Sequence, residues 1–264
     1  NTSHPTTGTS DSIIALDLET GEELWVFQAL ANDMWNFGCS AGGPNCIILD
    51  DTNSVDHDFG GPAILVEAGD RDLLIAGQKS GDIWALDPDT GNLVWNQRVG
   101  EGTALGGNHW GIATNSERAF MTINDPAGMN DNTQPGLYTY FVGTGEPSWF
   151  YNAEAKCNDQ RSSRLRRCQG LFGFSATPLS VDGAVITAGL DGRLYVFNSD
   201  SGELLFEYDT AQDGFETVNG VEGNGGSVDS HSIAAGSGMV FVGSGYGQFS
   251  QVAGNVLLAF RPAD

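Results

Sequence analysis

The feature that most constrains the fold is a phrase that the chain repeats. Residues 15–25 read A-L-D-L-E-T-G-E-E-L-W, and residues 85–95 read A-L-D-P-D-T-G-N-L-V-W. Two weaker copies occupy residues 139–149 and 196–206. The aromatic residues that close the four copies are 70, 54 and 57 residues apart: Trp25, Trp95, Trp149 and Phe206. An internal period near 50 residues is typical of arrays of small sheets, above all of a β-propeller.

Each copy has the chemistry of a strand, a tight turn and a second strand. The Asp of the turn can cap backbone N–H groups, and the Gly can adopt positive φ. Further apolar runs lie upstream of the copies, at residues 63–66, 73–76, 119–123 and 184–188. Gly and Asp interrupt the windows in which a helical pattern could build. The sequence therefore predicts an all-β protein with four-stranded blades and the four aromatic residues at equivalent positions.

The predicted blades divide the chain unevenly. Residues 1–28 hold the last strands of one blade, and one further blade is expected in each of the ranges 61–97, 110–151, 171–208 and 229–260. Four and a half blades do not close a ring, and propellers avoid long open edges. We expect residues 1–264 to be the C-terminal part of a longer propeller. The alternative is a small ring closed by pairing residues 256–260 with the N-terminal strand.

The charge of the chain excludes several classes of partner. Eleven basic and 34 acidic residues give a net charge of −23. Such a chain repels phosphate backbones, so neither nucleic acid nor an anionic membrane surface is an expected partner. No apolar run approaches the length of a transmembrane helix, so no membrane span is expected.

The four cysteines form two local pairs, Cys39 with Cys46 and Cys157 with Cys168. Neither spacing is C-x-x-C and no His is near, which argues against a zinc site. Two disulfides that fix loops are expected, and they indicate a periplasmic or secreted protein. The alternative is four unrelated free thiols.

The repeated phrase resembles the tryptophan-docking motif of the eight-bladed quinoprotein dehydrogenases, which use pyrroloquinoline quinone (PQQ). The segments between the copies resemble the polyvinyl-alcohol dehydrogenase branch of that family. They follow its order along nearly the whole chain and match about its C-terminal half. These segments include N-D-M-W-N at 32–36, D-H-D-F-G at 56–60, G-G-N-H-W-G at 106–111 and G-G-S-V-D at 225–229.

The resemblance implies an eight-bladed propeller and an alcohol oxidation. PQQ would lie in the central channel with Ca²⁺ at its quinone edge, and an Asp would act as base on the alcohol. Electrons would pass to a c-type cytochrome. The other half of the propeller, in a longer chain or a companion chain, would supply the rest of the site. The alternative is a secreted propeller of the same descent that has lost catalysis and binds a partner.

The resemblance places the basic residue that meets the quinone at Lys79, in the turn after strand 73–76. A lysine in a hairpin is otherwise an ordinary solvated side chain. Related enzymes carry the base after a Trp, but here Asn36 follows Trp35, and an amide cannot act as a base. We expect the base at Asp56 or Asp58, although an Asp that caps a strand would look the same.

The strand order makes a geometric prediction that does not need the family. Strands 62–66 and 73–76 can pair as antiparallel neighbours, so Asp56 and Lys79 should lie at the same end of one blade. The ammonium group should then lower the pKa of Asp56 and keep it ionised.

Further cofactor contacts and two calcium ligands are expected, from the resemblance and from the local composition. Asn108, His109 and Trp110 lie in the Gly-rich start of a strand, where Trp110 could equally dock between blades. Phe174 takes a cofactor-facing place in relatives but could be an ordinary core residue. Asn219 belongs to a long polar stretch, with Ser227 and Asp229, that suits a channel mouth. Calcium ligands are expected at Asp56 and at Asn1, the latter as a remnant of the family's Asn ligand.

One loop concentrates basic residues. Five of the eleven lie between residues 156 and 167: Lys156, Arg161, Arg164, Arg166 and Arg167. The segment resembles a processing site of secreted proteins, and the alternative is a solvated loop that tethers an acidic partner or the protein's own surface.

Overall fold

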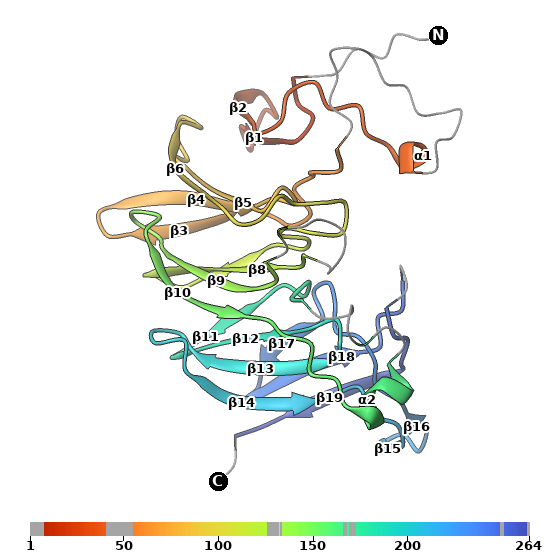
Figure 1. Ribbon diagram of the computed structural model, residues 1–264. Helices are drawn as coiled ribbons and strands as arrows, with labels where there is room; N and C mark the ends of the chain where they lie inside the picture. Colours follow the sequence, from red (N-terminus) through yellow and green to blue (C-terminus); the bar gives the residue numbers. More distant parts are fainter. Residues whose placement is uncertain are drawn as a thin grey trace.

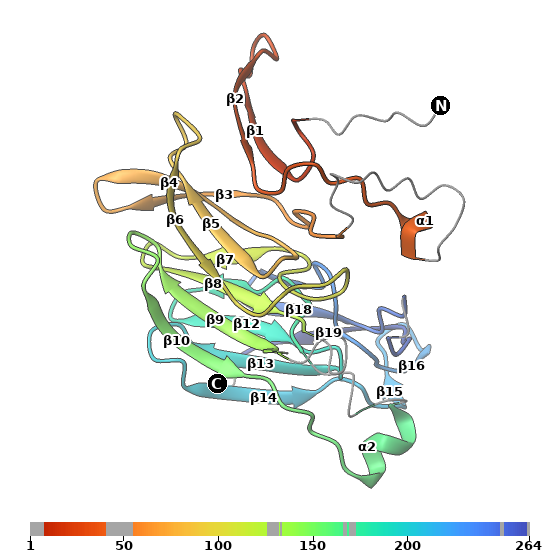
Figure 2. The same ribbon diagram turned by 45° about the horizontal axis from the view of Figure 1, so that its top comes forward.

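The computed structural model describes residues 8–40, 55–125, 132, 134–165, 168, 173–248 and 251–262. Antiparallel sheets stack on one another in chain order, from a pair of strands at one end to a three-stranded sheet at the other (Figures 1 and 2). The first pair comprises β1 (Ser12–Leu16) and β2 (Glu23–Gln28). The last sheet comprises β17 (Ile233–Gly236), β18 (Met239–Ser244) and β19 (Val256–Phe260).

Three four-stranded sheets lie between these ends. The first contains β3 (Ile64–Ala68), β4 (Arg71–Gly77), β5 (Asp82–Leu86) and β6 (Leu93–Arg98). The second contains β7 (Ile112–Thr114), β8 (Arg118–Ile123), β9 (Gly136–Phe141) and β10 (Pro147–Asn152). The third contains β11 (Leu179–Val181), β12 (Ala184–Ala188), β13 (Arg193–Asn198) and β14 (Leu204–Asp209). A short hairpin of β15 (Phe215–Glu216) and β16 (Glu222–Gly223) precedes the last sheet.

The first strands of neighbouring sheets contact one another, β3 with β7, β7 with β11 and β11 with β17. This arrangement turns the sheets into blades around a common inner edge, as the repeats predicted. The segments that lead into each first strand, and the turns that follow each second strand, therefore gather at one side of that edge.

The closing aromatic of one blade docks on the turn of the next blade. The indole Nε1 donates to a backbone carbonyl in three equivalent pairs: Trp25 to Pro88 (3.0 Å), Trp95 to Val142 (2.8 Å) and Trp149 to Ser199 (3.0 Å). Each ring covers the Gly of that turn, and a Cβ on Gly145 would lie 2.6 Å from the Trp95 ring. The expected equivalence of the tryptophans is confirmed.

The turns themselves use the predicted chemistry. Asp17 Oδ1 accepts from the backbone N of Thr20 at 2.7 Å and from its hydroxyl at 2.8 Å. Asp87 and Thr90 repeat this geometry in the next copy. The side chains between the blades form apolar clusters, whose largest fully buried members include Phe120, Phe174 and Phe197.

Helix is scarce in the described residues, as predicted. α1 (Phe37–Ser40) and α2 (Asp159–Arg164) are four and six residues long. Both project from the same side of the stack as the β15–β16 hairpin (Figures 1 and 2). No helical segment in the described part of the chain has the length and apolar character that a membrane span requires.

Two expectations about loops have different outcomes. Cys157 and Cys168 form the expected disulfide, with Cα atoms 6.0 Å apart. The expected Cys39–Cys46 disulfide stays a prediction, because Cys46 lies outside the described residues. The basic loop around α2 is tethered to the protein's own surface, because Arg161 is 2% exposed and pairs with Asp191. Arg166 and Arg167 are outside the described residues.

The small closed ring is not what the structure shows. In the described residues β19 pairs with β18 and β1 pairs with β2, and the two ends of the stack are separate sheets. Pairing of residues 256–260 with the N-terminal strand is therefore wrong for this structure. The physical reason is the docking geometry, which seats each blade on its successor in chain order and places β1–β2 and β17–β19 at opposite ends.

Candidate functional site

Lys79 and two aspartates meet at one end of the β3–β6 blade. Lys79 lies in the turn between β4 and β5, and Asp56 and Asp58 lie in the segment that leads into β3. The Lys79 Nζ is 2.8 Å from Asp56 Oδ1 and 3.0 Å from Asp58 Oδ2. The backbone N of Lys79 also donates to the Asp58 carbonyl at 3.1 Å. The predicted proximity of Asp56 and Lys79 is confirmed.

The two carboxyl groups differ in exposure and in pKa. Asp56 is 7% exposed, whereas the Asp58 side chain is 49% exposed. Burial, together with a hydrogen bond and repulsion from Asp58, raises the pKa of Asp56 to about 6, although Lys79 opposes the shift. Burial would also raise the pKa of Asp58, but hydrogen bonds from Asp56 and Lys79 outweigh it and hold that pKa below its usual value. The expected lowering of the Asp56 pKa is wrong, because burial outweighs the ammonium.

Two further carboxylates approach this pair. One oxygen atom from each of Asp11, Asp33 and Asp58 lies within 4.8 Å of the other two. Burial raises the pKa of Asp11 to about 7, and a hydrogen bond to Asp33 and repulsion from its charge add to the shift. Carboxylate oxygens are the type of ligand that a hard divalent cation prefers, and these three would supply part of its coordination shell. Neither Asp11 nor Asp33 was expected as a ligand, although Asp33 belongs to the segment 32–36 that resembles the family. The expected ligand Asn1 is outside the described residues.

Asn108 is a buried anchor of the segment before β7. Its Nδ2 donates to the carbonyls of Gly111 (2.8 Å) and Thr122 (2.9 Å). It is fully buried, and its Oδ1 lies against Gly77, where an added Cβ would be 2.3 Å away. This side chain therefore holds the segment that carries His109 and Trp110.

His109 and Trp110 lie next to each other, with ring centroids 4.7 Å apart. His109 is 7% exposed, and its Nδ1 is 3.0 Å from the hydroxyl of Ser175 in the next blade. Burial lowers the pKa of His109 to about 4, against the opposing charges of Asp229 and Asp58. The imidazole is thus neutral near pH 7. Lys79 and Asp58 are near enough to shift its pKa, Lys79 downward and Asp58 upward. Nothing in the sequence indicated Ser175, because the contact spans 66 residues.

Trp110 has an unsatisfied donor. Its Nε1 is buried and has no hydrogen-bond partner among the described residues. The ring of His231 lies 6.3 Å from the Trp110 ring, roughly edge to face. The Trp110 carbonyl accepts from Thr177 at 2.9 Å, so the backbone here is tied to the next blade as well.

Two other predicted positions, and the amide of Asn36, make contacts of their own. Phe174 is 1% exposed and stacks on Tyr151 in the core between two blades. Asn219 lies in the exposed turn between β15 and β16, where its Oδ1 accepts from Thr217. Asn36 accepts from the backbone N of Gly38 at 2.9 Å and so caps the start of α1.

The family model PQQ_2, described as outer membrane protein assembly factor BamB, matches residues 9–257. The chain belongs to the PQQ_2 family. The resemblance to PQQ quinoproteins noted in the sequence is thereby confirmed.

Two curated relatives of this PQQ_2 chain are polyvinylalcohol dehydrogenases. Those from a Pseudomonas species and from Sphingopyxis sp. strain 113P3 are each 32% identical over 265 residues. The alignments cover 95% of this chain, but 39% and 40% of the relatives. The chain thus spans about two fifths of their length.

Solved structures agree on the fold. BamB from Moraxella catarrhalis superposes with a TM-score of 0.51 at 14% identity, over 97% of this chain and 56% of that one. The quinohemoprotein alcohol dehydrogenase ADHIIG from Pseudomonas putida HK5 also superposes with a TM-score of 0.51 at 14% identity. That match covers 79% of this chain and 33% of the dehydrogenase. Both support the propeller architecture.

Proposed function

We propose that this chain forms part of a PQQ-dependent alcohol dehydrogenase that acts on a secondary or polymeric alcohol. The observation that carries the proposal is the shared contact of Lys79 with Asp56 and Asp58 at one end of a blade. A buried carboxyl group with a pKa near 6 is well matched to act as a general base at neutral pH. The 32% identity to polyvinylalcohol dehydrogenases supports the substrate class.

The residues present fit the cofactor and the metal that such an enzyme would use. Lys79 offers a buried cationic donor, and Trp110 offers an N–H without a partner among the described residues, so both suit an anionic quinone. Asp11, Asp33 and Asp58 offer convergent carboxylate oxygens for Ca²⁺. PQQ would accept the two electrons and the hydrogen of the alcohol carbon, while Ca²⁺ would polarise a quinone oxygen.

The protein's own groups would handle the proton. Asp56, ionised above about pH 6, takes the hydroxyl proton of the alcohol. Asp58, whose pKa stays low, remains charged and keeps Lys79 protonated next to the site. His109 is held in place by its hydrogen bond with Ser175 and lines the site as a neutral polar group.

The proposal includes the partners and the location of the enzyme. A c-type cytochrome would receive the electrons, and the remaining propeller half would come from a longer chain or a second chain. The Cys157–Cys168 disulfide supports a periplasmic or secreted location, because disulfides persist in oxidising compartments.

The test is reconstitution of the complete enzyme with PQQ and Ca²⁺, followed by near-ultraviolet absorbance and by alcohol-dependent reduction of a dye. We expect Asp56→Asn and Lys79→Ala each to cut turnover by at least about 100-fold, the low end for a general base. The matched control is Asp70→Asn, in the turn at the far end of the same blade, which should leave turnover unchanged.

Other outcomes are informative. If Asp56→Asn keeps full activity and Asp58→Asn loses it, the base is Asp58 and not Asp56. Absence of PQQ binding would overturn the proposal in favour of a binding scaffold of the same descent. Full activity of both aspartate variants would show that neither carboxylate is the base.

A further inference from the structure

A polar cavity of about 430 Å³ lies between α2 and the end of the β11–β14 blade. This volume is within the range of small-molecule sites. Residues of the α2 segment line one wall, and residues of β13, β14 and the loop after β14 line the other: Asn158, Arg161, Arg164, Arg193, Asp209 and Gln212. The cavity is separate from Lys79 and its aspartates, since none of those residues lines it.

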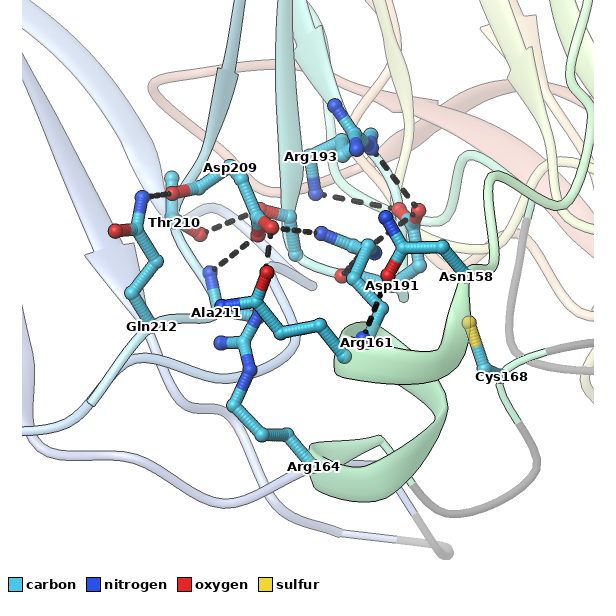
Figure 3. Close-up of polar contacts among 12 residues, drawn as sticks. Asn158, Arg161, Arg164, Cys168, Asp191, Arg193, Asp209, Thr210, Ala211 and Gln212 are labelled. Atoms are coloured by element: carbon cyan, nitrogen blue, oxygen red, sulfur yellow. Dashed lines mark hydrogen bonds and ion pairs between the residues drawn. The ribbon is translucent and has the colours of Figure 1, made fainter.

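Arg161 carries a buried charge into this cavity. Its side chain is 3% exposed, and its Nη2 donates to the Asp191 carbonyl at 2.5 Å and to Asp191 Oδ2 at 3.0 Å. Its Nη1 forms an ion pair with Asp209. Figure 3 shows the side chains of Arg161 and Arg164 leaving α2 and meeting Asp209. Local chain geometry holds them there, because Asn158 caps the helix and the Cys157–Cys168 disulfide closes the loop.

Three guanidinium donors around the cavity lack acceptors. Among the described residues, the Nε atoms of Arg161, Arg164 and Arg193 are buried and have no hydrogen-bond partner. The nearest carboxylate oxygen to Arg193 Nε in an ion pair is Asp191 Oδ2 at 3.9 Å, beyond hydrogen-bond distance. A buried donor without an acceptor destabilises the fold, so such groups point to an acceptor that the described residues do not supply.

The carboxylates at the cavity are already engaged. Asp209 Oδ2 pairs with Arg161 and Arg164, and its Oδ1 accepts from the backbone N of Ala211 at 3.1 Å. The lining contains three arginines and two aspartates, Asp209 and Asp213. Asp191 and Glu207 also pair with Arg161 and Arg193, so the carboxylates around the cavity offset the charge of the three arginines. What the cavity keeps in excess is guanidinium N–H donors without an acceptor among the described residues.

We propose that this cavity binds an oxyanion, the carboxylate or phosphate group of a small molecule. Planar guanidinium groups match both groups with paired, charge-assisted hydrogen bonds. The buried Arg161 anchors the anion, and Arg164, which is partly exposed, closes over it. The site does not depend on the proposed dehydrogenase activity.

Isothermal titration of the purified protein without cofactor tests the proposal. Inorganic phosphate and citrate are titrated separately in about 0.1 M NaCl, which screens the long-range field of the acidic chain. We expect binding of one anion per chain, and the stronger of the two titrants identifies the ligand class as a phosphate or a carboxylate. Arg164→Gln should weaken binding at least about tenfold, the equivalent of one charge-assisted hydrogen bond.

The matched control is Arg71→Gln. Arg71 is exposed at the start of β4 and contacts the Gly143 carbonyl, so the variant removes one positive charge away from the cavity. Its binding of phosphate or citrate should equal that of the wild type. The proposal would be overturned if neither anion showed saturable binding, or if Arg71→Gln and Arg164→Gln lost the same amount of affinity. The arginine donors would then be hydrogen-bonded to water.

Discussion

Asp56 and Asp58 share the ammonium group of Lys79, yet their pKa values move in opposite directions. The buried member of the pair titrates near pH 6, and the exposed member stays ionised. Each carboxyl group shifts the pKa of the other. As a result Asp58 keeps its negative charge, while Asp56 can take up a proton.

This coupling predicts the pH dependence of the proposed reaction. Asp56 must be ionised to act as base, so kcat/KM should rise with pH through about 6 and then level off. Asp58→Asn removes a group that raises the Asp56 pKa, and the rise should move to lower pH. Kinetics of the complete enzyme between pH 4 and 8 measures this. A rise that stays in place in Asp58→Asn would contradict the coupling.

Removal of Asp11 should stabilise the metal-free protein at high pH. Its pKa is raised to about 7, so the folded state holds a proton more tightly than the unfolded state. That contribution is complete below about pH 4 and is lost as the pH rises through 7. Asp11→Asn should raise the free energy of unfolding at pH 8 by on the order of 1 kcal/mol, after allowance for solvent screening, and change it little at pH 4.

Urea unfolding in EDTA measures this difference. Added Ca²⁺ supplies the second half of the experiment, since it should stabilise the wild type more at pH 8 than at pH 5 and should stabilise Asp11→Asn less. Equal stabilisation of the two proteins would show that Asp11 is not a ligand.

His109 should destabilise the fold in acid. Its pKa is lowered to about 4, so the neutral form is preferred in the folded state. As the pH falls from 6.5 toward 4, the unfolded state takes up the proton and the free energy of unfolding declines by up to about 3 kcal/mol. His109→Gln should flatten this decline, and urea unfolding at several pH values compares the two. Identical pH profiles would contradict a buried neutral imidazole.

The docking of a tryptophan on a glycine predicts a contrast between two close positions. Gly145 has a φ of +73° and lies under the Trp95 ring, so Gly145→Ala should cost about 2 kcal/mol or more. Gly143 belongs to the same turn, but a Cβ there would meet nothing within 4 Å, and Gly143→Ala should be nearly neutral. Thermal or urea unfolding of the two variants tests this. Equal stability would show that the contact with the ring carries no energy.

Much of the fold was predictable from the sequence because its determinants are local. The turn phrase, with Asp17 capping Thr20, needs only neighbouring residues and recurs in copy after copy. The meeting of Asp56 and Lys79 was also predictable, because it follows from the pairing of β3 with β4.

The rest of the site depends on contacts that no local pattern encodes. Asp11 approaches Asp33 and Asp58 through irregular backbone, with a φ of +45° at Asp11 and +60° at Asn32. Ser175 reaches His109 from another blade. The direction in which the pKa of Asp56 shifts depends on how deeply its side chain is buried. The sequence shows which residues are charged but not how deeply each one is buried.

The seating of each tryptophan on the following blade has a consequence for how the stack comes apart. Every blade interacts mainly with its two neighbours, so the free energy of unfolding behaves as a sum of blade energies and nearest-neighbour interfaces. The loss of Trp95 would therefore weaken the interface between the β3–β6 blade and the β7–β10 blade. The array would then unfold as two cooperative units, one made of β1–β6 and the other of the blades in residues 112–260. Unfolding would spread from the ends of the stack inward, and amide exchange should be slowest in the middle blades.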